Sequence, residues 1–326
     1  MKSLFCVLLT VVPLFAGCGL ASRGTAPLLT SLDDLSAIEL SPGEKLRIVA
    51  TTSILGDVVA HVSGQEIELE TLLPAGEDPH SFQPTPQDLR TISDAHVVFI
   101  NGLGLESFLD DTLASLSDQL WVVSISEHVP ARELDDHIVE DDHVHTIAMN
   151  DFDPHVWLDP NNVEIWVDNI TDALVTLNPN RAAHYISSAQ EYLASLQELD
   201  TWISEQIMRI PESDRILVTD HFALGYFADR YGFEILGAVV PSYSTDAEAS
   251  AQQLAALQEA IQAANAQALF VNVGTNPSVS AQLATDLDLQ LITLYIGTLS
   301  DSDGPASSYI DLMQYNVEAI VAALQR

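Results

Sequence analysis

The chain reads D-P-H-V-W-L-D-P from Asp153 to Pro160, with one histidine held between two Asp-Pro steps. Proline fixes its own φ and favours extended backbone at the residue before it, so the chain is stiff on both sides of His155. A side chain on stiff backbone loses little conformational entropy when it binds a ligand. His155 is therefore a candidate metal ligand or catalytic group. The alternative is an inert, hydrogen-bonded histidine in a rigid loop.

The same Asp-Pro-His triplet occurs earlier, over residues 78–80. In both triplets an acidic residue stands close to the imidazole, and a carboxylate can orient an imidazole through its second nitrogen. Two rigid corners of equal composition, in separate loops, favour one joint metal site built from His80 and His155 over two unrelated loops.

The first 18 residues predict export. A positive start is followed by an apolar run from Leu4 to Phe15 and by the small residues before Cys18, as in a secretory signal. The run is shorter than the about 20 residues that a membrane-spanning helix needs. Its ending, L-F-A-G-C, resembles the bacterial lipobox. This implies that residues 1–18 form a lipoprotein signal peptide and that Cys18 carries the lipid anchor; an ordinary signal peptide with a coincidental cysteine is the alternative.

The cysteine count limits the metal chemistry. The chain has two cysteines, Cys6 and Cys18. Export would remove the first and lipidation would consume the second, so no thiol would remain. A metal site must then be built from nitrogen and oxygen ligands, which suit zinc or manganese better than copper(I).

The charge balance excludes nucleic acid as a partner. Lys and Arg total 11 against 47 for Asp and Glu, a formal net charge of −36. Phosphate recognition needs the opposite sign. An acidic surface attracts cations, although a saline habitat would give the same composition.

Composition and length predict a tether and two lobes. Residues 19–44 carry Ser, Gly, Pro and acidic residues without a sustained pattern, which is typical of an acidic tether. The remaining roughly 280 residues exceed a typical single core. We expect an N-terminal lobe over 45–177, a connecting helix over 178–211 and a C-terminal lobe over 212–326.

Each lobe alternates short β-rich runs with helical ones, which predicts an α/β fold with mostly parallel sheets. Strands are expected over 46–50, 67–73, 96–100, 120–125, 215–219, 234–240, 268–273 and 290–295, and helices near 54–62, 222–231, 246–265, 277–286 and 306–324.

One long helix is expected between the lobes. Asn178 is a suitable N-cap, Pro179 suits the first helical position, and Pro211 ends the pattern. An apolar stripe repeats at spacings of four and three, formed by Tyr185, Ala189, Tyr192, Leu196, Leu199 and Ile203. About 30 residues span about 45 Å, which is enough to run along both lobes.

A third histidine, His221, stands between a predicted strand and a predicted helix in the C-terminal lobe. Open α/β sheets bind ligands at the carboxyl ends of their strands. His80 and His155 occupy equivalent loop positions in the first lobe, so three imidazoles from two lobes could converge on one cleft.

From residue 46 to residue 324 the chain resembles the ZnuA-like metal-binding lipoproteins that supply zinc or manganese to ABC importers. The motifs that carry the resemblance are P-A-G-E-D-P-H at 74–80, D-P-H-V-W-L-D-P at 153–160, His221 with G-Y-F at 225–227 and Y-G at 231–232, and Y-I-D-L-M-Q-Y-N at 309–316. The resemblance implies two α/β lobes joined by one long helix, with His80, His155 and His221 as metal ligands. Manganese members tend to carry a carboxylate at the third position, so His221 favours zinc.

The chain departs from the family pattern at Gly297, where members often supply a fourth ligand, an aspartate. Water, Asp301 or Asp303 could take that place. Residues 135–145 resemble the family's loop rich in His and Asp, which could hold a cation loosely; a solvated acidic loop without function is the alternative.

The resemblance implies a monomeric, extracytoplasmic, lipid-anchored substrate-binding protein that is not an enzyme. It would capture Zn2+, or with less preference Mn2+, and deliver it to an ABC transporter permease. A zinc-dependent hydrolase is one alternative, because three histidines and a water also describe catalytic zinc. Against it, the chain has no H-E-x-x-H motif. Glu77 is the one acid near a candidate ligand that suggests a general base, and the adjoining prolines argue against its reaching the metal. A surface adhesin is a further alternative that the sequence does not test.

Overall fold

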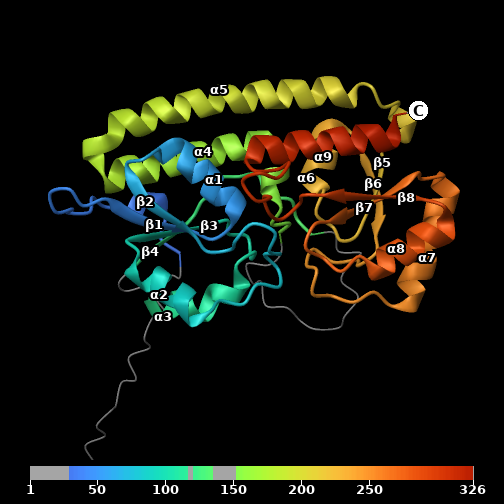
Figure 1. Cartoon of the computed structure of the whole chain (residues 1–326), viewed down its shortest axis with the longest axis horizontal. Helices are drawn as coiled ribbons and strands as arrows, with labels where there is room; N and C mark the ends of the chain where they lie inside the picture. Colours follow the sequence, from blue (N-terminus) through green and yellow to red (C-terminus); the bar gives the residue numbers. More distant parts are fainter. Residues whose placement is uncertain (1–28, 117–119, 135–151, 326) are drawn as a thin grey trace, which may run out of the picture.

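The computed structural model describes residues 29–116, 120–134 and 152–325. Two α/β lobes lie side by side, and helix α5 (Ala182–Ile207) runs along both of them (Figure 1). The predicted fold class, two mostly parallel α/β lobes joined by one long helix, is confirmed.

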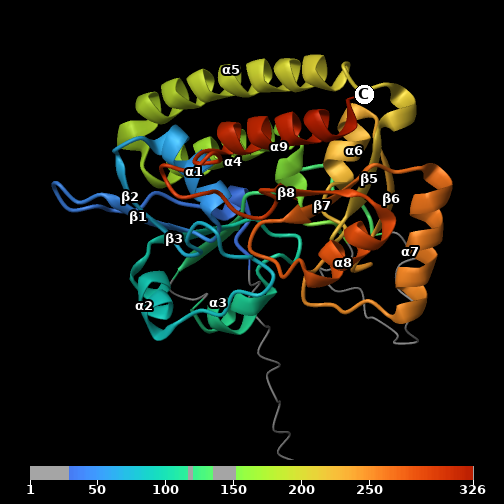
Figure 2. The same cartoon turned by 45° about the vertical axis from the view of Figure 1, so that its right-hand side comes forward.

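The N-terminal lobe is built on a four-stranded parallel sheet in the order β2-β1-β3-β4. The strands are β1 (Leu46–Ala50), β2 (Ile67–Thr71), β3 (Val97–Ile100) and β4 (Trp121–Ser124). Helices α1 (Ser53–Ser63) and α4 (Pro160–Leu177) lie on the face toward α5, and α2 (Pro86–Asp94) and α3 (Asp110–Leu116) on the other (Figure 2). All four residues of β3 are buried, as expected for a parallel sheet that is covered on both faces.

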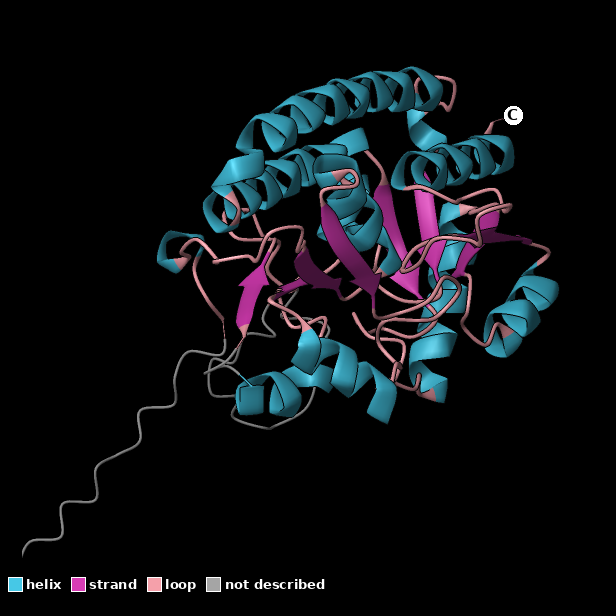
Figure 3. Cartoon of the chain, turned by 60° about the vertical axis from the view of Figure 1, so that its left-hand side comes forward, coloured by secondary structure: helices cyan, strands magenta, loops and turns pink. Residues whose placement is uncertain are grey.

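The C-terminal lobe repeats this arrangement with the strand order β6-β5-β7-β8, again parallel. The strands are β5 (Ile216–Thr219), β6 (Glu234–Ala238), β7 (Ala268–Asn272) and β8 (Gln290–Leu294). Its helices are α6 (Gly225–Tyr231), α7 (Ala251–Ala264), α8 (Ser278–Leu287) and α9 (Tyr309–Leu324). Figure 3 shows the strands between an upper and a lower layer of helices.

Short 3-10 turns connect several of these elements. They are η1 (Leu32–Asp34), η2 (Ser107–Leu109), η3 (Val156–Leu158), η4 (Pro179–Arg181) and η5 (Glu212–Asp214). The second Asp-Pro step of the D-P-H-V-W-L-D-P stretch starts helix α4. Asp159 accepts a hydrogen bond from the amide of Asn161 as the N-cap, and Pro160 is the first helical residue. The stiff backbone after His155 is thus the start of a helix.

The connecting helix packs on both lobes. Every residue of the predicted apolar stripe is at most 4% exposed, and α5 contacts α1 and α4 of the first lobe and α9 of the second. Asn178 is the residue before the 3-10 turn η4, and Pro179 is the first residue of that turn. Helix α5 itself begins at Ala182 and ends at Ile207, before Pro211. One continuous apolar core includes residues of both lobes and of α5. A helix packed in this way restrains relative movement of the lobes.

The segment before β1 packs on the N-terminal lobe from residue 29 on. Ile38 donates its amide hydrogen to the carbonyl oxygen of Leu177 at 2.9 Å, and Leu35 is 8% exposed. Residues 29–44, which were expected to belong to the tether, therefore lie on the fold, because their leucines and isoleucine find an apolar surface. The expected signal peptide lies outside the described residues. Within the part of the chain that the structure describes, no helix is long and apolar enough to cross a membrane.

Direct hydrogen bonds join the two lobes near their shared edge. The indole of Trp157 donates to the carbonyl oxygen of Ile296 at 2.8 Å, and the hydroxyl of Tyr309 donates to the carbonyl oxygen of Trp157 at 2.8 Å. Trp157 and Tyr309 are almost fully buried. Two hydrogen bonds therefore fix the loop that carries His155 to the C-terminal lobe.

Candidate metal centre

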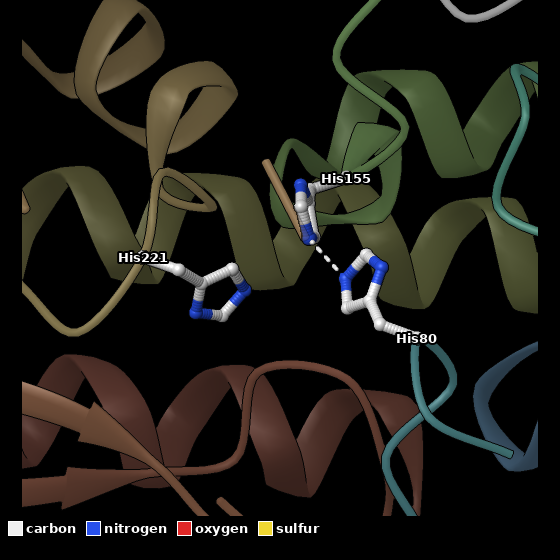
Figure 4. A group of neighbouring side chains, drawn as sticks. All are labelled: His80, His155 and His221. Atoms are coloured by element: carbon white, nitrogen blue, oxygen red, sulfur yellow. Dashed lines mark hydrogen bonds between the residues drawn. The ribbon is translucent and has the colours of Figure 1, made fainter. Parts of the chain in front are cut away.

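The three candidate ligands lie in three loops that follow strands. His80 lies beyond β2, His155 lies between β4 and η3, and His221 follows β5 directly. Because parallel strands end at the same edge of a sheet, these loops meet between the lobes. Figure 4 shows the three imidazole rings facing one another.

The distances between the rings suit one metal ion. One ring nitrogen from each of His80, His155 and His221 lies within 4.8 Å of the other two. The Nε2 atoms of His80 and His155 are 3.1 Å apart. Two nitrogens bound to a tetrahedral zinc ion at about 2.05 Å would be about 3.3 Å apart, so the cluster needs shifts of about an ångström to bind one ion. No other group of three potential metal ligands occurs within the described ranges.

Two carboxylates orient two of the imidazoles. Asp153 Oδ1 lies 2.8 Å from Nδ1 of His155, and Asp220 Oδ1 lies 2.8 Å from Nδ1 of His221. Because a carboxylate accepts the hydrogen bond, Nδ1 carries the hydrogen and Nε2 presents its lone pair. Nε2 of His221 is buried and has no hydrogen-bond partner among the described residues. A buried nitrogen without a partner is unusual and indicates a ligand.

The repeated Asp-Pro-His triplet has a structural explanation. Asp78 Oδ1 accepts the backbone amide of His80 at 3.1 Å, and Asp153 Oδ1 accepts that of His155 at 3.0 Å. An aspartate that binds the amide two residues ahead makes a tight local turn, which the intervening proline stiffens. The triplet thus sets the direction of each histidine side chain.

Burial favours the neutral form of two of the imidazoles, His80 and His155. Burial, followed by the neighbouring histidines, lowers the pKa of His80 well below its usual value. Burial also lowers the pKa of His155, although the hydrogen bond to Asp153 acts in the opposite direction. His155 and His221 are each 1% exposed, whereas part of His80 stays open to solvent. Neutral imidazoles are the form that binds a metal ion.

The carboxylate of Asp220 stays ionised beside its imidazole. Burial raises its pKa, but hydrogen bonds from His221, from the amide of Asn272 and from the hydroxyl of Thr275 outweigh this, and the pKa is lowered. No role for Asp220 was expected from the sequence, although its position directly before His221 was a usable signal. The contributions of Asn272 and Thr275 could not be predicted from the sequence, because about 50 residues separate them from Asp220.

Gly297, where the resemblance leads us to expect an aspartate, lies tightly against the loop of His80. A Cβ atom at this position would lie 2.8 Å from Cδ and 3.1 Å from Cγ of Pro79, the residue before His80. Asp301 and Asp303 are exposed and do not belong to the three-histidine cluster. They line a separate hollow together with Gly76 and Gly274.

A cavity of about 430 Å³ connects His80 with the solvent. It is lined in part by Leu103, Leu105, Phe152, Pro154 and Tyr243. Of the three candidate ligands, His80 is the one that lines this cavity. The acidic loop 135–145, a possible second cation-binding element, lies outside the described residues.

Comparisons with known proteins agree with the geometry. The family profile described as ZnuA, zinc-uptake complex component A, periplasmic, matches residues 48–323. The chain is 32% identical over 321 residues to the manganese-binding lipoprotein MntA of Halalkalibacterium halodurans, covering 98% of this chain and 97% of the relative. It is 26% identical to the manganese ABC transporter substrate-binding lipoprotein PsaA of Streptococcus pneumoniae, covering 88% of this chain and 92% of the relative.

Solved structures of metal-binding proteins have the same fold. The periplasmic zinc-binding protein TroA from Treponema pallidum superposes with a TM-score of 0.77 at 27% identity, covering 87% of this chain and all of TroA. A manganese-bound mutant of a periplasmic metal-binding protein from Candidatus Liberibacter asiaticus gives 0.75 at 26% identity, covering 86% of this chain and all of that protein. The profile match spans most of the chain, and MntA aligns with it over nearly its whole length; the chain therefore belongs to the ZnuA family of metal-binding proteins.

Proposed function

We propose that the protein is the extracytoplasmic substrate-binding component of an ABC importer and that it captures one divalent metal ion between its lobes. His80, His155 and His221 would bind the ion, and a membrane permease would receive it. The observation that carries the proposal is the buried Nε2 atom of His221, which faces the two other imidazoles and has no hydrogen-bond partner among the described residues.

Zinc is the proposed cargo, with manganese second. Three neutral imidazole nitrogens with one open position suit tetrahedral zinc, whereas carboxylate and water ligands suit manganese. The relatives include proteins named for each metal, namely MntA and PsaA for manganese and TroA for zinc. Within the described residues no carboxylate joins the cluster, and this favours zinc. A water molecule would complete the coordination.

Calorimetric titration of the protein without residues 1–18 tests both statements. We expect one zinc ion per chain, bound more tightly than manganese. His221→Ala should weaken zinc binding by at least about 100-fold, because it removes one of three protein ligands and the carboxylate-oriented nitrogen. His128→Ala is the matched control, since His128 is largely exposed and its nearest acid is Glu127. Equal zinc binding by wild type and His221→Ala would contradict the proposal.

Cys18 is the proposed lipid anchor, which would hold a monomeric protein at the outer face of the membrane. The similar chains MntA and PsaA carry the word lipoprotein in their names. Growth with a labelled fatty acid should label the wild-type protein, and Cys18→Ala should remove the label and release the protein into the soluble fraction. Retention of the label by that variant would contradict the anchor.

We also infer that the protein is not an enzyme. The relatives' names describe binding proteins, and Glu77, the acid that a zinc hydrolase would need as a general base, is exposed and lies outside the three-histidine cluster. The zinc-loaded protein should not turn over ester or peptide substrates. Turnover that Glu77→Gln abolishes would favour the hydrolase instead.

A further inference from the structure

Arg132 links the metal cluster to the opposite lobe. It follows β4 in the N-terminal lobe, and its Nη1 atom lies 3.2 Å from Oδ2 of Asp153. Its Nε atom donates to Oδ2 of Asp229, on helix α6 of the C-terminal lobe, at 2.6 Å. The other oxygen of Asp153 holds Nδ1 of His155. A continuous series of polar contacts thus runs from Asp229 through Arg132 and Asp153 to His155.

Backbone hydrogen bonds also connect Arg132 and Asp153 to each other and to helix α6. The carbonyl oxygen of Arg132 accepts the amide of Asp153 at 2.9 Å, and the amide of Arg132 donates to the hydroxyl of Tyr226 at 2.9 Å. That hydroxyl donates in turn to the carbonyl oxygen of Asp153 at 2.8 Å. Tyr226 lies on α6. Arg132 and Asp153 are therefore bound to the same short helix by backbone and by side chain.

Gly225 makes this close approach of α6 possible. A Cβ atom at residue 225 would lie 2.7 Å from Cζ of Arg132 and 2.7 Å from Oδ2 of Asp153. Both distances are shorter than any ordinary van der Waals contact. A larger residue would have to push the guanidinium away from the carboxylate, because Asp153 is fully buried and has no room to move.

The other orienting carboxylate is held differently. Asp220 Oδ2 accepts the amide of Asn272 and the hydroxyl of Thr275, two neutral donors from its own lobe. Asp153 has a cationic partner, and that partner contacts the other lobe. Movement of one lobe against the other therefore disturbs the partner of His155 and leaves that of His221 in place.

We propose that Arg132 is a positioning residue that makes the orientation of His155 depend on the docking of helix α6. The inference rests on the proposed function, since it assumes that His155 binds the metal ion. With α6 docked, the guanidinium neutralises and fixes the buried Asp153, which holds the imidazole toward the ion. With α6 displaced, Arg132 would lose Asp229 and the hydroxyl of Tyr226, the contacts that hold its guanidinium in place against Asp153, and the orientation of His155 would loosen. Opening of the lobes would then loosen a metal ligand and promote release.

The rate of zinc release into excess chromophoric chelator tests the inference. Arg132→Met keeps most of the length of the side chain and removes its charge, and we expect release about tenfold faster, the lower end of the effect of losing an orienting partner of a metal ligand. Gly225→Ala should act in the same direction by displacing the guanidinium. Arg132→Lys should release zinc at a rate between those of the wild type and Arg132→Met, because an ammonium can bind one carboxylate but does not span two as a guanidinium does.

Arg230→Met is the matched control. Arg230 also lies on α6, but it pairs with Asp200 of α5 and approaches Asp159, the N-cap of α4, at 3.8 Å, and neither of these acids is hydrogen-bonded to a candidate metal ligand. Loss of this ion pair should leave zinc release at the wild-type rate. An equal acceleration in both arginine variants would mean that α6 simply needs its ion pairs, and it would overturn the inference.

A double-mutant cycle with Asp153→Asn separates positioning from general stability. If Arg132 acts through Asp153, Arg132→Met should no longer accelerate release in the Asp153→Asn background. Independent, multiplying effects would overturn the inference, as would a lowered unfolding temperature with an unchanged release rate. If the wild-type protein binds neither zinc nor manganese, the proposed function fails; if it binds zinc and Arg132→Met releases it at the wild-type rate, only the role of Arg132 fails.

Discussion

The hydroxyl of Thr245 donates a hydrogen bond of 2.6 Å to Oδ2 of Asp78 across the two lobes. The other oxygen of Asp78 accepts the amide of His80. A single carboxylate thus joins a loop of the C-terminal lobe to the loop that carries a candidate metal ligand. The Arg132 contact connects the lobes through the aspartate that binds His155, and this hydrogen bond connects them through the aspartate that binds His80.

Replacement of this hydroxyl should accelerate metal release. Thr245→Val keeps the shape of the side chain but leaves a buried carboxylate oxygen without its donor, at a cost of about 1 kcal/mol or roughly fivefold in the rate of zinc release. The measurement is transfer of zinc to a chelator in stopped flow. Thr285→Val is the control, because that hydroxyl bonds to the carbonyl oxygen of Ala281 on the exposed face of α8. Unchanged release in Thr245→Val would mean that the contact does not hold the lobes closed.

The carboxylate of Asp220 should contribute strongly to affinity. Asp220→Asn removes the charge that orients His221, and loss of such a partner typically weakens metal binding about 10- to 100-fold. Competition against a chelator of known affinity measures the change. Asp286→Asn on the exposed surface of α8 serves as the control. Wild-type affinity in Asp220→Asn would contradict the assignment of Nε2 of His221 as the metal-binding atom.

Zinc affinity should stay nearly constant from about pH 8 to about pH 6.5 and fall at lower pH. The pKa values of His80 and His155 are lowered by burial, so both imidazoles are neutral above the usual histidine pKa of about 6.5. As the pH falls through the lowered values, protons compete with the metal ion for the same nitrogens. Affinity measured by competition at several pH values tests this. A steep loss of affinity already between about pH 8 and pH 7 would contradict it.

Glu106 should make the stability of the metal-free protein depend on pH. Its carboxyl group accepts hydrogen bonds from the hydroxyl of Thr51 and from the amides of Asn101 and Gly102, and burial raises its pKa from 4.5 to about 7. The folded state therefore keeps a proton that the unfolded chain has lost between these two values. The contribution of Glu106 to stability is present in full below about pH 4.5 and declines as the pH rises toward 7.

Urea denaturation of wild type and Glu106→Ala measures this contribution. The variant should be less stable by about 2 kcal/mol or more, because three buried donors lose their acceptor. The difference between wild type and variant should be larger at about pH 5 than at about pH 8. A difference that grows as the pH rises would contradict the raised pKa.

An aspartate at residue 297 should weaken zinc binding even though it adds a carboxylate. Its Cβ atom would displace Pro79 and with it His80, at a typical cost of about 1–3 kcal/mol for an overfilled site. Gly297→Ala is the matched variant, because it adds the same Cβ atom without an oxygen. We expect both variants to bind zinc more weakly than wild type. Tighter binding by Gly297→Asp would mean that the loop adapts and that the missing ligand limits affinity.

Local patterns were sufficient to predict much of the fold. The β-rich runs predicted the strands of both described sheets to within a few residues, and the spacing of Tyr185, Tyr192 and Leu196 predicted the buried face of α5. Helix α4 was not predicted, although Asp159 and Pro160 carry a common start signal for a helix. The packing of residues 29–44 was also missed, because a few leucines in a polar segment do not reveal that an apolar surface lies nearby.

The clustering of the three histidines could be predicted from the sequence, but the contacts that hold their loops across the lobes could not. Each histidine lies close to an aspartate in the chain, so the clue was local. Arg132 and Thr245 act across the boundary between the lobes, and Tyr226 is far from Asp153 in sequence. Such contacts depend on how the lobes are docked, which is decided by the whole core and by α5.

X-ray absorption at the zinc edge of the zinc-loaded protein tests the central claim most directly. We predict one zinc ion per chain with three imidazole nitrogens at about 2.0–2.1 Å and one oxygen ligand. We further predict that His221→Ala reduces the imidazole count to two. A shell with fewer than three imidazoles in the wild type, or a shell that His221→Ala leaves unchanged, would contradict the three-histidine site.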